Sequence, residues 1–270
     1  MLSYVELAAS TSMYGMGIVA QSVAARRVER RGAGLALLAR LARDRLYLVG
    51  FAGQAGGFVL AFLARASLPL YLVQAGSSCA IGLATVVGVV LLRWRVRFAE
   101  VAMLVVMAAG LVLLAAAATP AASGDIPPEM ELVLFLLPLL TGPAAALACR
   151  RDATLSLAVL AGVQFALVAV CGRSIADEAI LDLPLDPVAW LVLLSALLGQ
   201  ACLSAALARA GPTSTVASMD AVTMVISSVA GIAVLGDPVV PGREWSVVVG
   251  IVLVLSAVLG PAVRRAREAP

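Results

Sequence analysis

The feature that most constrains this chain is a series of long apolar runs. Each run is about 18 to 25 residues long, and a helix of that length crosses a hydrocarbon layer of about 30 Å. The runs do not alternate between polar and apolar residues, as the strands of a membrane barrel would. Of the 270 residues, 62% are hydrophobic and 13% charged, which is more apolar side chain than a soluble core of this size could bury. The sequence therefore predicts an all-α, polytopic membrane helical bundle, with the lipid bilayer as its main partner.

Breaks that carry charge, proline or glycine divide the apolar runs into nine candidate spans. They cover residues 3–25, 46–64, 68–92, 98–118, 131–148, 153–172, 188–208, 212–235 and 244–263. The segment 28–45 contains a further apolar stretch, but this stretch is too short to cross and has arginines around it. We therefore expect this segment to form an amphipathic helix on the cytoplasmic surface.

All 19 basic residues are arginines, and their distribution predicts the orientation of the spans. With the N-terminus outside, the cytoplasmic loops and ends carry 16 of the 19 arginines. Arg65, Arg173 and Arg243 then lie on the outer side, together with the acidic loop at 177–186. Because loops rich in arginine stay in the cytoplasm, we expect an N-out, C-in protein that crosses the cell membrane many times.

A sequence repeat links the two halves of the chain. Residues 63–66 read Leu-Ala-Arg-Ala, as do residues 207–210, and in both copies a glutamate follows the arginine by 35 residues. Upstream of each copy lies a Gly-Gln-Ala tripeptide, at 53–55 and at 199–201. Three coincidences in the same order indicate that the halves share an ancestor.

The expected orientation places Arg65 outside and Arg209 inside, so the two repeats are predicted to be inverted. Inverted repeats are the architecture of many secondary transporters, which bind substrate between the repeats near the middle of the membrane. The predicted parts are a first half with four spans (1–118), an extracytoplasmic linker (119–130), a second half with five spans (131–263) and a cytoplasmic tail (264–270).

Several diffuse motifs resemble the drug/metabolite transporter superfamily, which includes the EamA-like permeases. Leu-Pro-Leu at 68–70 and Val-Gln-Ala at 73–75 open the third span, and Gly-Pro-Thr-Ser at 211–214 opens the eighth. Glu244 and Gly250 belong to the pattern of the ninth span. The resemblance implies a secondary membrane transporter that moves a small metabolite or lipophilic compound by alternating access.

Within that superfamily, the nine-span, N-out plan is similar to the NIPA-type magnesium transporters. The first span, which runs from Leu-Ala-Ala-Ser at 7–10 into Arg26 and Arg27, is similar as well. That family places an acidic residue after the Ala-Gly pair of the second span, whereas this chain has Gln54, and a neutral amide supplies no charge to balance a divalent cation. A magnesium transporter, a lipid-carrier flippase and a structural subunit of an envelope assembly remain alternatives.

Polar side chains inside apolar spans are costly, so they are the main candidates for a substrate site. Asp220 lies about 12 Å of helix from the cytoplasmic surface, too deep for its short side chain to reach water. A helical wheel places Thr213, Asp220, Thr223 and Ser227 on one face of the eighth span, and an acid there could couple transport to protons. Structural hydrogen bonding between helices is the alternative role for these side chains. The candidate residues of a central cavity are Asp220, Gln54, Gln200, Gln74, Thr223 and Ser204.

The composition also argues against several classes of protein. The chain has no histidine, so it lacks the ordinary Ser-His pair of a hydrolase and the commonest nitrogen ligand for metals. Four scattered cysteines show no paired spacing, and the arginines are explained by topology rather than by nucleic acid. We therefore expect no enzymatic activity, no bound metal or cofactor and no nucleic-acid partner. A small-molecule or ion substrate is expected, and a homodimer is compatible with the sequence.

Overall fold

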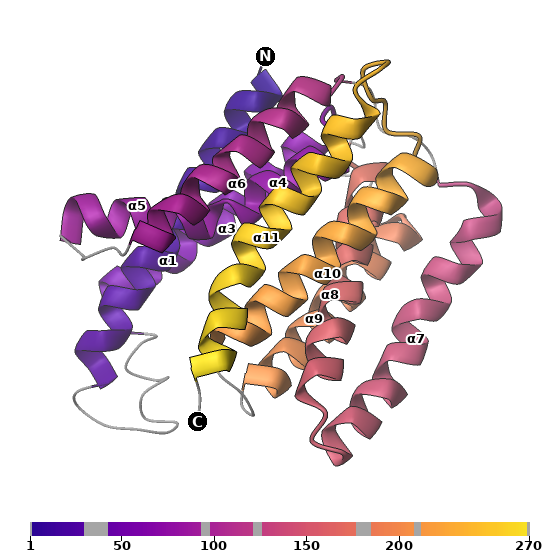
Figure 1. Ribbon diagram of the computed structural model, residues 1–270. Coiled ribbons are helices and arrows are strands. Elements are labelled where there is room, and N and C mark those ends of the chain that lie inside the picture. Colours follow the sequence, from indigo (N-terminus) through magenta and orange to yellow (C-terminus); the bar gives the residue numbers. More distant parts are fainter. Residues whose placement is uncertain are drawn as a thin grey trace. The chain divides into compact units, whose positions relative to one another are not determined.

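A computed structural model describes residues 2–29, 43–92, 98–120, 126–176, 185–207 and 212–268 of the chain (Figure 1). Within these ranges the chain is helical almost throughout and has no β-strand, apart from an isolated bridge between Ala118 and Val239. The all-α fold class is therefore confirmed. The helices are α1 (Leu2–Glu29), α3 (Arg45–Arg65), α4 (Leu70–Ser78), α5 (Ala80–Leu92), α6 (Phe98–Ala117), α7 (Pro128–Arg150), α8 (Thr154–Ser174), α9 (Pro187–Leu207), α10 (Pro212–Ala233) and α11 (Glu244–Glu268).

Each predicted span falls on a described helix, and the third span is divided at Cys79 into α4 and α5. Among the described residues, six segments are long and apolar enough to cross a membrane, which identifies the chain as a membrane protein. They are Arg45–Arg65, Leu70–Val90, Leu132–Arg150, Thr154–Ser174, Pro187–Leu207 and Thr215–Ala233. The apolar parts of α6 and α11 are shorter. Nine crossings and the N-out orientation stay predictions.

Some predicted segments lie wholly or partly outside the described residues. These are most of the amphipathic segment 28–45, residues 121–125 of the linker, most of the acidic loop and most of the second Leu-Ala-Arg-Ala copy. Helix α11 continues to Glu268, so residues 264–268 of the predicted tail extend the last helix.

Proline and glycine mark several of the helix ends. Helices α7, α9 and α10 begin on Pro128, Pro187 and Pro212, because the first helical N–H has no partner within the helix and its loss costs little. After α10 the chain turns at Gly236, whose φ of 65° lies in the left-handed region that glycine adopts without strain. Asp237, the next residue in the chain, therefore lies at this turn.

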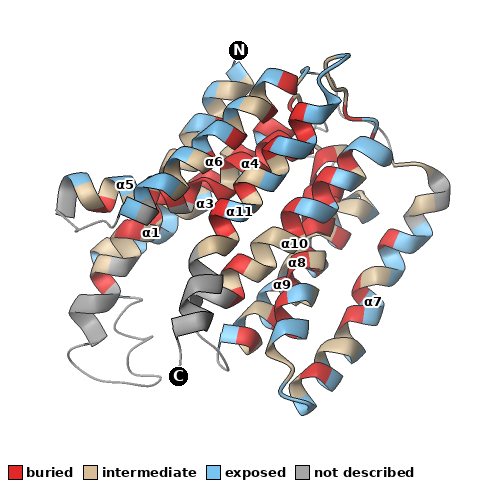
Figure 2. Cartoon of the chain, viewed as in Figure 1, coloured by how far each residue is buried: buried red, intermediate tan, exposed pale blue. Residues whose placement is uncertain are grey.

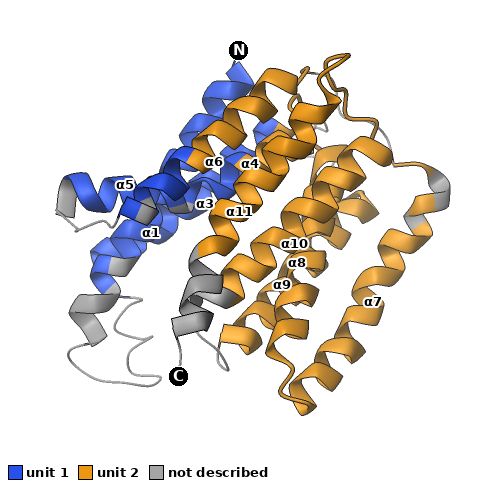
Figure 3. Ribbon diagram, viewed as in Figure 1, with its two compact units in different colours: residues 1–64, 76–105 blue, residues 65–75, 106–270 orange. Residues whose placement is uncertain are grey.

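The chain divides into two compact units (Figure 3). Unit 1 contains residues 1–64 and 76–105, and unit 2 contains residues 65–75 and 106–270. Three helices, α3, α4 and α6, therefore contribute residues to both units. The short segment 65–75 belongs to unit 2, although the chain before and after it belongs to unit 1.

In unit 1, helix α1 packs closely against α3 and α5 through glycines. A Cβ atom on Gly17 would lie 2.7 Å from the carbonyl oxygen of Gly50, and one on Gly15 would lie 3.0 Å from that of Ala80. Such short distances require residues without side chains, as is common where membrane helices touch. The hydroxyl of Ser10 on α1 donates a hydrogen bond of 2.7 Å to the carbonyl oxygen of Gly57 on α3, so it links these two helices.

In unit 2, helix α8 packs against α7, α9 and α10, and α10 also packs against α11. Most residues in the second half of α8 are buried, as its colour shows in Figure 2. A Cβ atom on Gly162 of α8 would lie 2.7 Å from the carbonyl oxygen of Met219 on α10. Exposed leucines on the outer faces of α7 and α9 present an apolar surface suited to lipid.

Candidate functional site

The polar face predicted for α10 lies where this helix crosses α8. The hydroxyl of Thr223 donates to the carbonyl oxygens of Gly162, at 3.1 Å, and of Met219, at 2.9 Å. One turn further on, the Ser227 hydroxyl donates to the carbonyl oxygen of Thr223 at 2.6 Å. Asp220 is half-buried, and its Oδ2 atom is shielded from solvent. The side chain of Thr213 lies outside the described residues.

Three glutamines occupy three different settings. Gln54 of α3 accepts a hydrogen bond of 3.1 Å from the Nε2 group of Gln21 on α1, within unit 1. Gln74 of α4 is buried and belongs to unit 2. Gln164, which is fully buried, donates to the hydroxyl of Thr141 at 2.6 Å and joins α8 to α7. The amides of Gln54 and Gln164 thus link neighbouring helices, which is the structural role given above as the alternative for Gln54.

Gln200 and Ser204 lie together on an exposed face of α9. The hydroxyl of Ser204 donates to the carbonyl oxygen of Gln200 at 2.8 Å, so it satisfies the backbone of its own helix. Thr223, in the same unit, is buried against α8. The structure therefore brings Asp220 and Thr223 together on α10, and Gln200 and Ser204 together on α9. A cavity shared by Gln54 and Gln200 stays a prediction.

A buried ion pair, whose two residues are not among the site residues predicted from the sequence, forms the second polar centre. The Nη2 atom of Arg173, near the end of α8, lies 2.7 Å from the Oδ1 atom of Asp237, and both side chains are at most 1% exposed. The Nη1 atom of Arg173 donates to the carbonyl oxygen of Leu68 at 2.6 Å and to that of Arg65. The Oδ2 atom of Asp237 accepts the N–H of Leu70 at 2.6 Å.

This ion pair joins two helix ends that would otherwise be unsatisfied. Helix α3 ends at Arg65 with carbonyl oxygens that lack intrahelical partners, and Arg173 donates to that of Arg65 and to that of Leu68 in the turn that follows. Helix α4 begins at Leu70, whose N–H has no carbonyl partner within the helix, and Asp237 accepts it. A cation at a helix C-terminus and an anion at an N-terminus are both favoured by the helix dipole. The only sequence signal for this site was a Gly-Asp-Pro turn after an apolar span, at residues 236–238.

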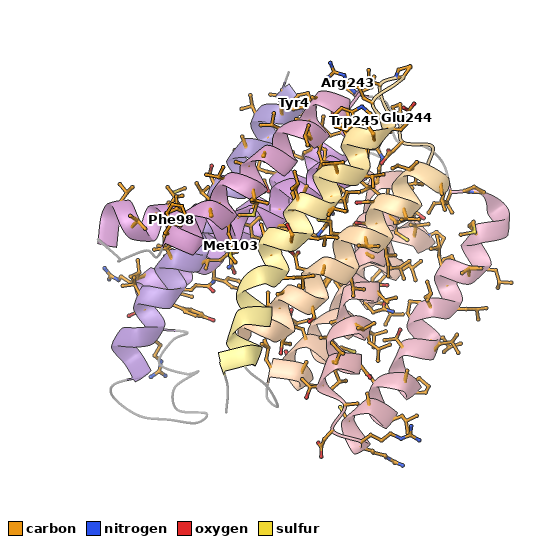
Figure 4. All side chains as sticks on the ribbon, viewed as in Figure 1. Tyr4, Phe98, Met103, Arg243, Glu244 and Trp245 are labelled. Atoms are coloured by element: carbon orange, nitrogen blue, oxygen red, sulfur yellow. The ribbon has the colours of Figure 1, made fainter. Side chains whose placement is uncertain are left out.

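The third arginine expected on the outer side also satisfies a helix end. The Nη1 atom of Arg243, just before α11, donates to the carbonyl oxygen of Ala116 in the last turn of α6 at 2.8 Å. Arg243, Glu244 and Trp245 lie together where α11 begins (Figure 4). Close by, the hydroxyl of Tyr71 donates to the carbonyl oxygens of Ala117 and Pro238, each at 3.3 Å.

The environment of Asp237 changes its acidity. Burial raises the pKa of its carboxyl group, and the Arg173 guanidinium and the Leu70 N–H offset only part of that rise. Besides Arg173, the charged and titratable residues of the neighbouring segment 65–75 are Arg65 and Tyr71. The ionised carboxylate is therefore held at a net cost of desolvation.

We predict a pH dependence of stability that comes from Asp237. A carboxyl group with a raised pKa binds its proton more tightly in the folded chain than in the unfolded chain. The stabilisation that this proton binding gives the folded chain is fully present below about pH 4, the ordinary pKa of aspartate. It is lost as the pH rises through the raised pKa of the folded state. The Tm of the wild type should therefore fall relative to that of Asp237→Asn, which cannot titrate, as the pH rises from about 4 to 7. Thermal unfolding of both proteins in one detergent at several pH values measures the difference in Tm. A difference that stays constant, or that shifts in favour of the wild type as the pH rises, would contradict the prediction.

The described residues contain no group of three or more His, Cys, Asp or Glu side chains that could hold a metal ion. Comparisons with models of protein families, with curated proteins and with solved structures found no match to this chain. The fold and the apolar helices define a helical membrane protein, and its relation to the drug/metabolite transporter superfamily stays a prediction from the sequence.

Proposed function

We propose that this protein is a secondary membrane transporter of the drug/metabolite type, which moves a small metabolite or lipophilic compound by alternating access. The observation that carries the proposal is a packing pattern that occurs twice. In unit 1, glycines of α1 approach α3 and α5, and in unit 2, glycines join α8 to α9 and to α10. Together with the repeated sequence motifs, this pattern supports two related halves, the plan on which many carriers are built.

Asp220 is the residue to which we assign proton coupling. It follows Met219, whose carbonyl oxygen lies at the close contact between α8 and α10, and it shares a helix face with Thr223. A carboxyl group in this position can change its charge while the two helices move against each other. We assign substrate contacts to Gln54, Gln74, Gln200 and Ser204, together with Thr223.

Two exposed tryptophans support helix starts that lie at a membrane surface. Trp190 lies in the first turn of α9, and Trp245 lies in the first turn of α11. The arginine distribution assigns both helix starts to the outer side. Tryptophan is enriched at both interfaces between membrane and water, so the two exposed indoles support placing both helix starts at an interface, whichever side that is.

The test is transport in vesicles. Purified protein is reconstituted into liposomes that contain a pH-sensitive dye, and a panel of small amines, amino acids and lipophilic cations is added outside. We expect at least one compound to cause a proton flux that depends on protein. Asp220→Asn should abolish the pH dependence, because the amide cannot release a proton. Asp152→Asn is the matched control, since Asp152 lies in an exposed turn with a φ of 49° that asparagine also tolerates.

Two outcomes would overturn this proposal. An unchanged pH dependence in a folded Asp220→Asn protein would remove the coupling role. Vesicles that take up magnesium, or that move fluorescent lipids between leaflets, without transporting any of the small compounds would replace the proposed function with one of the alternatives.

A further inference from the structure

The segment 65–75 holds an unusual place in the chain. It belongs to unit 2, yet residues 1–64 before it and 76–105 after it belong to unit 1. A segment connected on both sides to another unit must be kept in place by contacts of its own. These contacts join the segment to residues of unit 2.

Two kinds of contact do so. Leu70 packs in a buried cluster with Ala169 and Val170 of α8 and with Leu235, which follows α10. Polar contacts from the ion pair hold the backbone, because Arg173 donates to two carbonyl oxygens of the segment and Asp237 accepts the N–H of Leu70. The two residues of the ion pair thus bind the backbone of the segment at the turn between α3 and α4.

The position of Asp237 depends on a close approach to a glycine. A Cβ atom on Gly231 would lie 2.5 Å from the Oδ2 atom of Asp237, the same atom that accepts the N–H of Leu70. The N–H of Asp237 in turn donates to the carbonyl oxygen of Gly231 at 2.8 Å. A Cβ atom there would also lie 3.0 Å from the Cβ atom of Leu70, so any side chain at Gly231 would displace both the carboxylate and the residue that it holds, while leaving both charges in the chain.

The ion pair is also weakly stabilised in its buried position. Removing two charges from water is expensive, and their attraction repays this only when both are fully satisfied. Burial still raises the pKa of Asp237 despite its partners, so part of the desolvation cost is not recovered. The buried Nε atom of Arg173 also has no hydrogen-bond partner among the described residues, so opening the pair costs less than opening a fully satisfied one.

We propose that Arg173 and Asp237 form a latch that holds residues 65–75 on unit 2, and that this latch opens to release the segment. The inference rests on the proposed function in one respect, because in a carrier the release would open the side to which Arg65 and Arg173 are assigned. The latch itself is a property of the fold, so its opening can be measured without a substrate.

Hydrogen exchange of the full-length protein in detergent, read by mass spectrometry, tests the latch. In the wild type, peptides covering 66–75 should exchange faster than those covering 158–172 of α8, because release of the segment leaves α8 folded. Gly231→Ala should accelerate exchange of 66–75 about tenfold, the factor that corresponds to about 1.4 kcal/mol, and leave α8 unchanged. Gly142→Ala is the matched control, since a Cβ atom there meets nothing within 4 Å, and it should change neither region.

Several results would overturn the latch. Equal protection of 66–75 and α8 in the wild type would show that the segment never opens separately, and this comparison decides the matter even if Gly231→Ala fails to fold. Unchanged exchange in a folded Gly231→Ala protein, or equal acceleration of both regions, would also reject it. If exchange behaves as expected but the vesicles show no flux of any compound, the latch stands and the proposed function fails.

Discussion

Replacing Arg173 with methionine is expected to lower the free energy of unfolding by about 3–5 kcal/mol, the range found when one partner of a buried ion pair is removed. The side chain of methionine fills much of the same space but donates no hydrogen bond. The carbonyl oxygens of Arg65 and Leu68 would lose their shared donor, and each unsatisfied buried group costs about 1–3 kcal/mol. Asp237 would remain buried without its cation.

Asp237→Asn is expected to cost much less than Arg173→Met. The side-chain oxygen of asparagine can still accept the N–H of Leu70, and burial already raises the pKa of Asp237, so a neutral side chain avoids a desolvation cost that the carboxylate carries. Arg173→Lys should lie between the two, because lysine keeps the charge but lacks the planar fork that reaches the carboxylate and two carbonyl oxygens together. Thermal unfolding of all three variants in one detergent gives the order. A Tm for Arg173→Met equal to that of the wild type would contradict this account of the ion pair.

The helices of this fold could be predicted because their cause is local. Apolar runs of sufficient length form helices in a membrane wherever they occur, since every backbone group must be satisfied within the segment. Proline and glycine marked several of the ends, as at Pro187, Pro212 and Gly236. The break at Cys79 was not predicted, because the apolar character of the third span continues through it.

The ion pair of Arg173 and Asp237 could not be predicted, because its partners come together only in three dimensions. Asp237 and Leu70 are 167 residues apart, and Arg173 and Arg65 are 108 residues apart. From the sequence, Arg173 counted only as a charge outside the membrane. Its actual task, satisfying the end of another helix, depends on tertiary packing that hydropathy does not encode.

The polar face of α10 was easier to predict than the exposure of α9. A helical wheel shows which residues share a face, so it grouped Thr223 with Ser227. It does not show which face turns inward. Thr223 is buried against Gly162, whereas Gln200 and Ser204 are exposed, and this difference follows from the packing of α8 between its neighbours.

Replacing Gly162 with valine is expected to be among the most damaging single changes in unit 2. A Cβ atom at this position would lie 2.7 Å from both the carbonyl oxygen of Met219 and the Cβ atom of Val222. Because one of these atoms is backbone, the clash can be relieved only by moving α8 away from α10. Forcing extra volume into a packed core costs about 1–3 kcal/mol, and a branched side chain against backbone should reach the upper end of that range. The movement would also lengthen the hydrogen bond from Thr223 to the carbonyl oxygen of Gly162.

Two other glycines provide a graded control for this change. A Cβ atom on Gly199 would lie 3.2 Å from the Cβ atom of Gln164, a side-chain contact that a small shift can relieve, and one on Gly142 would meet nothing within 4 Å. In the alanine series we therefore expect the largest fall in Tm for Gly162, a smaller one for Gly199 and the smallest for Gly142, where the added Cβ atom meets only the adjoining Pro143. Gly162→Val should then fall below Gly162→Ala. A Gly162→Ala protein as stable as Gly142→Ala would show that α8 and α10 are not in close contact at this crossing, and would remove the structural basis for placing Asp220 beside it.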